Sequence, residues 1–224
     1  MSKLLSAILP TKGRGPQALR CLNRLYETTN GFDIELFVIA HPDESNEVLT
    51  LDSLPEFFCC KLEFMDIKPL AAYNWAAERS IGTHLFDFDD DAWFHDDWLK
   101  KVFEVFDAIP NGHGYVKIQS DSQNYWAERA IGNREVYKDI MGGVISIPHY
   151  YSQYNDVEKS DRAIAAGLFF QSDAYIEHRH WVYGKAEKDI TYIEGGVKYV
   201  THDHNMYAER KKAGFPNDYE AVIK

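Results

Sequence analysis

The first half of the chain alternates short apolar runs with helix-like stretches, and this alternation constrains the fold more than any other feature. The runs that we interpret as strands are Leu4–Leu9, Ile34–Ala40, Lys61–Ile67 and His84–Phe88. Helical patterns lie between and after them, at residues 16–28, 46–54 and 69–79, and again beyond Asp96 or Asp97, which would cap that helix. Strands that alternate with helices predict an α/β fold, Rossmann-like, with a mainly parallel twisted sheet flanked by helices.

The second half, beyond residue 110, is less regular. Glycines interrupt it, aromatic residues are frequent, and we expect antiparallel or edge strands joined by long loops. There is no low-complexity linker and no internal repeat, and 224 residues suit a single α/β domain. We therefore expect one domain.

The net charge is −11, from 24 Lys and Arg against 35 Asp and Glu. An acidic surface repels a phosphate backbone, which argues against general binding of nucleic acids. The charge is also uneven, because residues 1–26 contain no acid whereas residues 87–97 contain six aspartates. More than half of the net charge therefore comes from one short segment.

Cysteine content and targeting signals point to a soluble, cytoplasmic chain. The three cysteines are too few for a disulfide framework or a zinc site, and we expect them to be reduced and packed in a core. The apolar run near the N-terminus is too short for a signal peptide, and no run is long enough to span a membrane. We accordingly expect no membrane partner.

The predicted topology brings four loops to one edge of the sheet. Ligands of open α/β sheets bind beyond the carboxyl ends of the strands, where the loops Pro10–Gly15, His41–Ser45, Lys68–Pro69 and Asp89–Asp91 would lie. A basic, glycine-containing turn and an acidic cluster would then meet, and a phosphate-bearing ligand with a divalent cation would satisfy both.

The acidic cluster follows an apolar strand directly. Alternate residues of an extended chain face the same way, so Asp89 and Asp91 are able to approach one cation, and hard divalent ions prefer carboxylate oxygens. The alternative is a solvated acidic loop, to which we assign Asp96 and Asp97. The spacing matches neither an EF-hand nor a haloacid-dehalogenase-type phosphatase, and Gly13-Arg14-Gly15 lacks the ending of a Walker loop.

Four ordered elements resemble GT-A glycosyltransferases of the family 2 kind. Ser6–Arg14 resembles the opening strand and its P-T-x-x-R turn, and Tyr73–Ala77 resembles an Arg-Asn-x-Gly-like motif with Tyr73 in place of the common arginine. Phe88–Asp91 resembles the DXD element, followed by a "pdWL"-like segment at His95–Leu99. Asn155–Arg162, with Ala166-Gly167, resembles the E-D-x-D/E-x-x-x-R…A-G element, with Asn155 in place of the usual Glu.

The resemblance implies a metal-dependent enzyme of the inverting kind, which transfers a sugar from a nucleotide diphospho-sugar to an acceptor hydroxyl. Residues 1–110 would form the nucleotide-sugar-binding half and residues 111–224 the acceptor-side half of the same domain. The resemblance implies that Mn²⁺ or Mg²⁺ is the cofactor, with Asp89, Asp91 and His178 as metal ligands and His180 as a close rival of His178. The implied donor-binding residues are Pro10, Thr11, Arg14, Asp43, Asn74, Asp89 and Asp90. Asp156 takes the position of the catalytic base, with Glu158 and Asp161 in reserve.

Other functions stay open at this stage. A nucleotidyltransferase would use the same combination of strand and carboxylates, and a non-catalytic nucleotide- or carbohydrate-binding module would need no base. The acceptor is not specified by the sequence. A glycan fits best, and a modified DNA base, served by Arg210-Lys211-Lys212, fits less well because those charges suit a solvated helix face.

Overall fold

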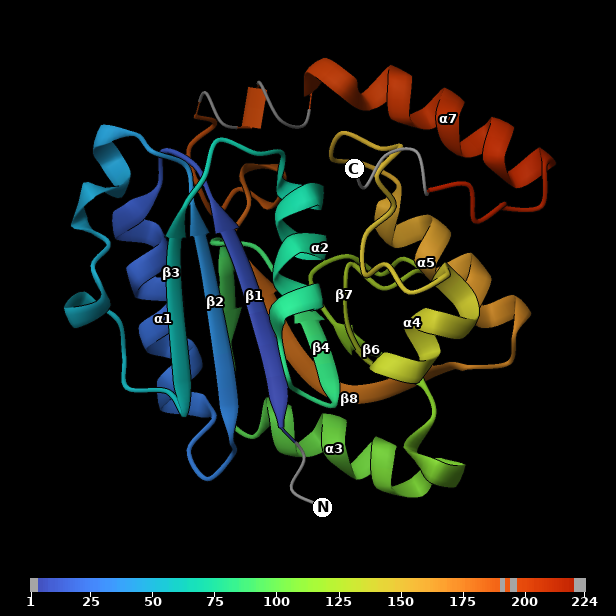
Figure 1. Cartoon of the computed structure of the whole chain (residues 1–224), viewed down its shortest axis with the longest axis horizontal. Helices are drawn as coiled ribbons and strands as arrows, with labels where there is room; N and C mark the ends of the chain where they lie inside the picture. Colours follow the sequence, from blue (N-terminus) through green and yellow to red (C-terminus); the bar gives the residue numbers. More distant parts are fainter. Residues whose placement is uncertain (1–3, 190–191, 194–196, 220–224) are drawn as a thin grey trace.

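The computed structural model describes residues 4–189, 192–193 and 197–219. In this part of the chain eight strands form one curled sheet in the order β3-β2-β1-β4-β7-β6-β8-β5, so both halves of the chain share a single sheet (Figure 1). The strands are β1 (Leu5–Thr11), β2 (Ile34–Ala40), β3 (Cys59–Phe64), β4 (His84–Asp87), β5 (Ala92–Phe94), β6 (Tyr115–Gln119), β7 (Arg129–Asn133) and β8 (Phe169–His178). The helices are α1 (Gly15–Thr28), α2 (Pro69–Arg79), α3 (Trp98–Ala108), α4 (Arg134–Met141), α5 (Asn155–Ala165) and α7 (Val200–Lys212).

The expected parallel sheet forms from the first half of the chain. β1 pairs in parallel with β2 and with β4, and β2 pairs in parallel with β3. The later strands are mixed, because β7 is antiparallel to β4 and to β6, and β8 is parallel to β6 but antiparallel to β5. The irregular second half therefore supplies the antiparallel strands that its sequence indicated.

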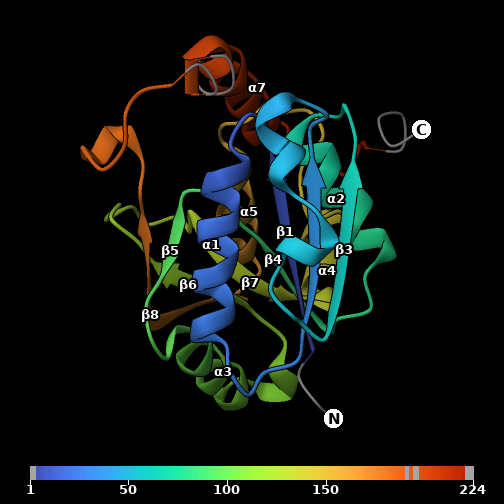
Figure 2. The same ribbon diagram turned by 90° about the vertical axis from the view of Figure 1, so that its left-hand side faces the viewer.

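Two hydrophobic layers cover the two faces of the sheet. One layer packs α1 and α3 against alternate residues of β1 and β2, including Leu5, Ala7 and Leu9. The other layer packs α2, α4 and α5 against the opposite face, where Ile8 and Phe37 point. Figure 2 shows α1 standing next to β5 on the first face.

The expected helix over residues 46–54 is wrong. Two short 3₁₀ turns occupy this region, η1 (Glu44–Val48) and η2 (Leu51–Ser53). The Asp43 carboxylate accepts from the Asn46 amide, and Thr50 and Ser53 form a reciprocal capping box. These local side-chain bonds close single turns and compete with a continuous helix.

Three smaller expectations also need correction. The third strand begins at Cys59 rather than Lys61, because its pairing with β2 starts at Cys59 opposite Glu35. Asp97 precedes α3 in a left-handed conformation (φ 59°) without a side-chain capping bond, whereas the Asp96 carboxylate accepts from Arg24. Of the three cysteines, Cys21 is buried in the core, but Cys59 and Cys60 are only partly buried on the edge strand.

Gly15 allows the turn after β1 to pack tightly. A Cβ at this position would lie 2.2 Å from the backbone oxygen of Ser45, so a side chain would push η1 away from α1. The close approach fixes the turn after β1 beside the turn after β2, at the edge where a ligand is expected.

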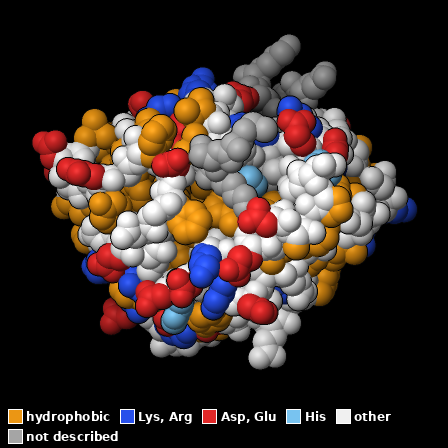
Figure 3. Space-filling model, turned by 90° about the horizontal axis from the view of Figure 1, so that it is seen from below, with side chains coloured by type: hydrophobic (Ala, Val, Ile, Leu, Met, Phe, Trp, Pro, Cys, Tyr) orange, Lys and Arg blue, Asp and Glu red, His pale blue; other side chains and the backbone are white. Residues whose placement is uncertain are grey.

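One face of the molecule carries side chains of both charges (Figure 3). Seen from below, acidic and basic side chains are interspersed around hydrophobic ones, without a patch of a single sign (Figure 3). Among the described residues, no helix has the length and apolar character needed to cross a bilayer.

Candidate active site

The loops after β1, β2 and β4 meet at one edge of the sheet, as the topology required. Asp90 is buried and joins the loop after β4 to the turn after β1. Its carboxylate accepts from the Thr11 hydroxyl at 2.8 Å, from Arg14 Nη1 at 3.2 Å and from Gln17 Nε2 at 3.2 Å. The basic turn and the acidic cluster thus form one connected unit.

Arg14 is held by more than Asp90. Its Nε and Nη2 donate to the two oxygens of Asp189 at 2.9 and 2.8 Å, and its guanidinium stacks 3.8 Å from the ring centre of Tyr192. This forked contact with a carboxylate has the geometry that arginine also uses for phosphate. Arg14 is therefore already oriented at the edge where a phosphate would bind.

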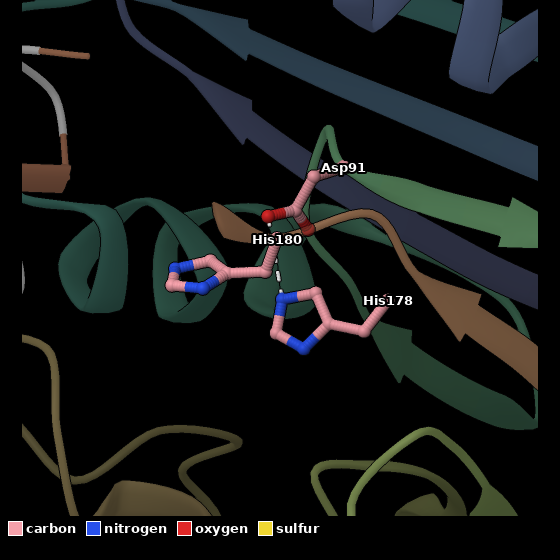
Figure 4. Close-up of side chains that lie close together, drawn as sticks. All are labelled: Asp91, His178 and His180. Atoms are coloured by element: carbon pink, nitrogen blue, oxygen red, sulfur yellow. Dashed lines mark ion pairs between the residues drawn. The ribbon is translucent and has the colours of Figure 1, made fainter. Parts of the chain in front are cut away.

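Asp91 points toward two imidazoles from the end of β8 and the residues after it (Figure 4). His178 Nε2 lies 3.3 Å from Asp91 Oδ2, and one ligand atom from each of Asp91, His178 and His180 falls within 4.8 Å of the others. The antiparallel pairing of β5 with β8, with Ala92 opposite His178, brings these residues together. The two rival histidines of the sequence therefore both lie at the site.

Burial and neighbouring charges shift the pKa values of all three residues in this cluster. Burial opposes ionisation of Asp91, but the hydrogen bond and charge of His178, together with the Arg129 charge, lower the pKa of Asp91. Burial also opposes charge on His178, yet the carboxylates of Asp91 and Glu128 raise its pKa. Burial and the neighbouring His178 lower the pKa of His180 to about 4, so His180 is neutral at pH 7.

Asp89 lies outside this three-residue cluster. Its carboxylate is 58% exposed, accepts from the Tyr73 hydroxyl at 3.3 Å and lies 3.5 Å from Arg129 Nη2. The Tyr73 hydroxyl also donates to the Phe88 carbonyl at 2.9 Å. Tyr73, which replaces the arginine common in the resembled motif, thus supports the acidic loop directly.

Arg129 is a residue that the sequence reasoning missed. It is buried at the start of β7, and its Nη2 lies 3.3 Å from Asp91 Oδ1. In sequence it opens an unremarkable apolar strand, and only the antiparallel pairing of β7 with β4 carries it to the acidic loop. No local pattern was available to find it.

Several expected donor residues serve as anchors of the surrounding loops. The Asn74 side chain accepts from the amides of Ile145 and Ser146 and donates to the Ser146 carbonyl. Asp43 accepts from the Gly13 amide at 2.9 Å and from Asn46. Pro10 lies within β1, opposite Ile39 of β2. These contacts position the loops around the site.

Asp156 is the second residue of α5 and is partly exposed. Its Oδ1 accepts from the Val157 amide at 2.9 Å. Burial of the carboxyl group is the main cause that raises its pKa, to about 6, with Glu128 adding to the shift and Lys159 opposing it. A carboxyl group with this pKa is deprotonated at neutral pH and remains basic enough to accept a proton.

Glu158, the residue expected in reserve for Asp156, lies away from solvent. The residue is fully buried and accepts from Tyr150, Arg162 and Arg210. This ion-pair cluster joins α5 to α7, and its carboxylate oxygens are already engaged. Asp161, the other reserve base, accepts from Tyr125, Tyr207 and Lys211 on the outer side of α5.

The residues present fit a divalent cation. A carboxylate and two imidazoles are a suitable donor set for a first-row ion such as Mn²⁺. His180 is neutral at pH 7, and the buried His178 Nδ1, 3.5 Å from Glu128, makes no hydrogen bond to any residue in the described part of the chain. A pocket of about 290 Å³ borders Asp90 and Asp91, with Gln17 and Arg20 on its α1 side.

Several solved structures share this fold at low sequence identity. A mannosyltransferase, PcManGT from Pyrobaculum calidifontis in complex with GDP-Man and Mn²⁺, superposes with a TM-score of 0.60 and 19% identity over 77% of this chain and 56% of its own. A TarS fragment from S. aureus superposes with a TM-score of 0.57 and 12% identity, over 79% of this chain and 58% of its own. A mutant Drosophila galactosyltransferase 7 in complex with manganese, UDP-Gal and xylobiose superposes with a TM-score of 0.56 and 14% identity, over 85% of this chain and 78% of its own.

The chain spans a little over half the length of the first two of these proteins. No curated protein has a sequence that matches it significantly. The family model of glycosyl transferase family 2, however, matches residues 6–170, which include the turn after β1, the acidic loop and the start of α5. With this match and its GT-A fold, the chain belongs to glycosyl transferase family 2.

Proposed function

We propose that this protein is a metal-dependent glycosyltransferase that moves a sugar from a nucleotide diphospho-sugar to an acceptor hydroxyl with inversion. The observation that carries the proposal is the cluster of Asp91, His178 and His180 at the carboxyl edge of the sheet, in a chain of family 2. The similar structures with GDP-Man and Mn²⁺, and with manganese and UDP-Gal, support the same class of reaction.

Asp91 and His178 would hold Mn²⁺ or Mg²⁺, and His180 would join them. When bound, the cation would act as a Lewis acid that neutralises charge on the diphosphate leaving group. The two imidazoles favour Mn²⁺ over Mg²⁺, because Mg²⁺ strongly prefers oxygen ligands. Asp89 is exposed and lies beside the cluster of Asp91, His178 and His180. It would contact a water molecule or the nucleotide at the edge of the site.

The donor would lie across the loops after β1, β2 and β4. Thr11 and Arg14, fixed by Asp90, would face the phosphates or ribose, and Arg14 would exchange Asp189 for a phosphate oxygen. Pro10 and Asp43 would shape the nucleotide pocket, and Asn74 would hold the loop at residues 145–146 beside it.

Asp156 would act as the base. In an inverting transfer the acceptor oxygen bonds to the anomeric carbon as the bond to the diphosphate breaks, and Asp156 takes the hydroxyl proton. The pKa of about 6 leaves its carboxylate ionised at pH 7 while keeping it able to accept that proton. Residues 111–224, which supply Asp156, would form the acceptor side, and residues 1–110 the nucleotide-sugar side. A glycan hydroxyl is the acceptor that we favour over a modified DNA base.

The test is turnover with a panel of UDP- and GDP-sugars, with Mn²⁺ or with EDTA, measured as release of the nucleoside diphosphate. We expect slow donor hydrolysis that needs the metal, and faster release when a suitable glycan is added. Pyrophosphate release from a nucleoside triphosphate and a sugar phosphate would instead identify a nucleotidyltransferase. Nucleotide-sugar binding without any turnover would identify a non-catalytic module.

A further inference from the structure

Arg129 places a buried positive charge against the acidic loop. The side chain is 1% exposed, and its Nη2 lies 3.3 Å from Asp91 Oδ1 and 3.5 Å from Asp89 Oδ2. The placement follows from topology, since the register of β7 against β4, with Ile131 opposite Phe86, sets the start of β7 next to the end of β4.

Arg129 uses one nitrogen, Nη2, to donate long hydrogen bonds to Asp91 and Asp89. Its Nε and Nη1 are buried and make no hydrogen bond to any residue that the structure describes. Leaving two buried donors without partners costs free energy. The charged groups that face it are the carboxylates of Asp89, Asp91 and Glu128, with His178 close by.

This arrangement affects how strongly the divalent cation binds with and without the diphosphate. A fixed cation beside Asp91 repels a second cation there, and the repulsion is strong in a buried setting. A diphosphate brings negative charge that attracts both cations. A site with this built-in charge therefore binds a divalent ion weakly alone and better with the diphosphate.

We propose that Arg129, through the positive charge that it places beside Asp89 and Asp91, couples binding of the divalent cation to binding of the nucleoside diphosphate. This inference rests on the proposed function, because it assumes that Asp91 is a metal ligand. By linkage, the factor by which the diphosphate strengthens metal binding equals the factor by which the metal strengthens diphosphate binding.

The experiment compares wild type with Arg129→Met, which keeps an unbranched stem like that of arginine and removes the charged guanidinium group. Free Mn²⁺ is followed by electron paramagnetic resonance in the absence of nucleotide, and UDP and GDP are titrated calorimetrically at saturating Mn²⁺. We expect Arg129→Met to bind Mn²⁺ alone about tenfold more tightly and UDP or GDP about tenfold more weakly. Shifts of opposite sign separate a charge effect from general damage, which weakens both.

Two controls accompany this variant. Arg129→Lys keeps the charge, and both affinities should stay within about threefold of wild type. Lys138→Met removes one positive charge from the exposed face of α4 and should change neither affinity, because distant exposed charges are screened.

The proposal is overturned if Arg129→Met binds Mn²⁺ alone no more tightly than wild type, or if its affinity for UDP and GDP is unchanged. If wild type binds no Mn²⁺ with or without UDP and GDP, the metal site itself fails and the inference fails with it. Should Arg129→Met not fold, Asp89→Asn tests the same balance at an exposed position. It should weaken binding of Mn²⁺ alone severalfold, and an unchanged affinity for Mn²⁺ would overturn the proposal.

Discussion

Thr11 and Asp90, 79 positions apart, are joined by a hydrogen bond of 2.8 Å that connects the end of β1 to the acidic loop after β4. The bond is buried, and the same carboxylate also accepts hydrogen bonds from Arg14 and Gln17. The basic turn and the aspartate cluster, which the sequence predicted to meet at one edge of the sheet, therefore form one structural unit.

Thr11→Val should destabilise the protein and weaken nucleotide binding. The substitution keeps the shape but leaves the buried Asp90 carboxylate with one donor fewer, at a cost of about 1–3 kcal/mol. Urea denaturation measures this loss, and UDP and GDP titrations measure the affinity. Thr201→Val, on the exposed side of α7, is the matched control and should stay within about 0.5 kcal/mol of wild type. Equal stability of the two variants would contradict the role given to the Thr11–Asp90 bond.

Asp91→Asn should abolish metal-dependent turnover while the protein stays folded. Removal of the carboxylate takes away the anionic ligand of the proposed site, and we expect a loss of at least about 100-fold in nucleoside diphosphate release. The matched control is Asp96→Asn, an aspartate of the same segment that pairs with Arg24 at the surface and should keep wild-type turnover. Unchanged turnover in Asp91→Asn would contradict the proposal that Asp91 is a metal ligand.

Asp156→Asn should spare nucleotide binding and remove transfer, because the amide cannot take the acceptor proton. In wild type, kcat/KM should rise with pH through an apparent pKa near 6, the value to which burial raises this group from 3.8. A transfer rate that stays independent of pH between 5 and 7 would argue against Asp156 as the base.

The same residue gives a prediction about stability. Since the pKa of Asp156 is higher in the folded than in the unfolded state, the folded protein binds this proton more tightly. Protonation therefore stabilises the fold, and the stabilisation is lost as pH rises from about 4 to about 6. Asp156→Asn should be at least as stable as wild type at pH 7.5, and urea denaturation at pH 7.5 and at pH 4 should show this advantage shrinking at the lower pH. A variant that is less stable than wild type at pH 7.5 would contradict this view.

Glu158→Gln should unfold more easily and should not behave as the loss of a base. The side chain is fully buried against Arg162 and Arg210, and removing its charge leaves both guanidinium groups without their main partner. We expect a destabilisation of about 3–5 kcal/mol by urea denaturation. Turnover per folded molecule should retain the pH dependence of wild type. A fully stable but inactive Glu158→Gln would instead restore the catalytic role that the sequence suggested for this residue.

Sequence reasoning located the edge of the sheet but not the function of each side chain there. Strand and helix positions in the first half followed from periodicity, and β2 and α2 have the bounds that their patterns predicted. The failure at residues 46–54 has a local cause, since Asp43 and Thr50 cap single turns that hydrophobic spacing cannot reveal. Glu158 looked like a second acid beside Asp156, but the helical turn directs it inward to Arg162 and Arg210.

By itself, the sequence determined the α/β alternation, the acidic loop at the end of an apolar strand and the resemblance to family 2, because each of these is a local pattern. Only the tertiary structure decided which side chains meet. His178 and His180 reach Asp91 through the pairing of β5 with β8, and Arg129 reaches Asp89 and Asp91 through the antiparallel pairing of β7 with β4. These contacts join residues far apart in the chain, and their register is set by how the sheet buries both of its faces, which no short segment encodes alone.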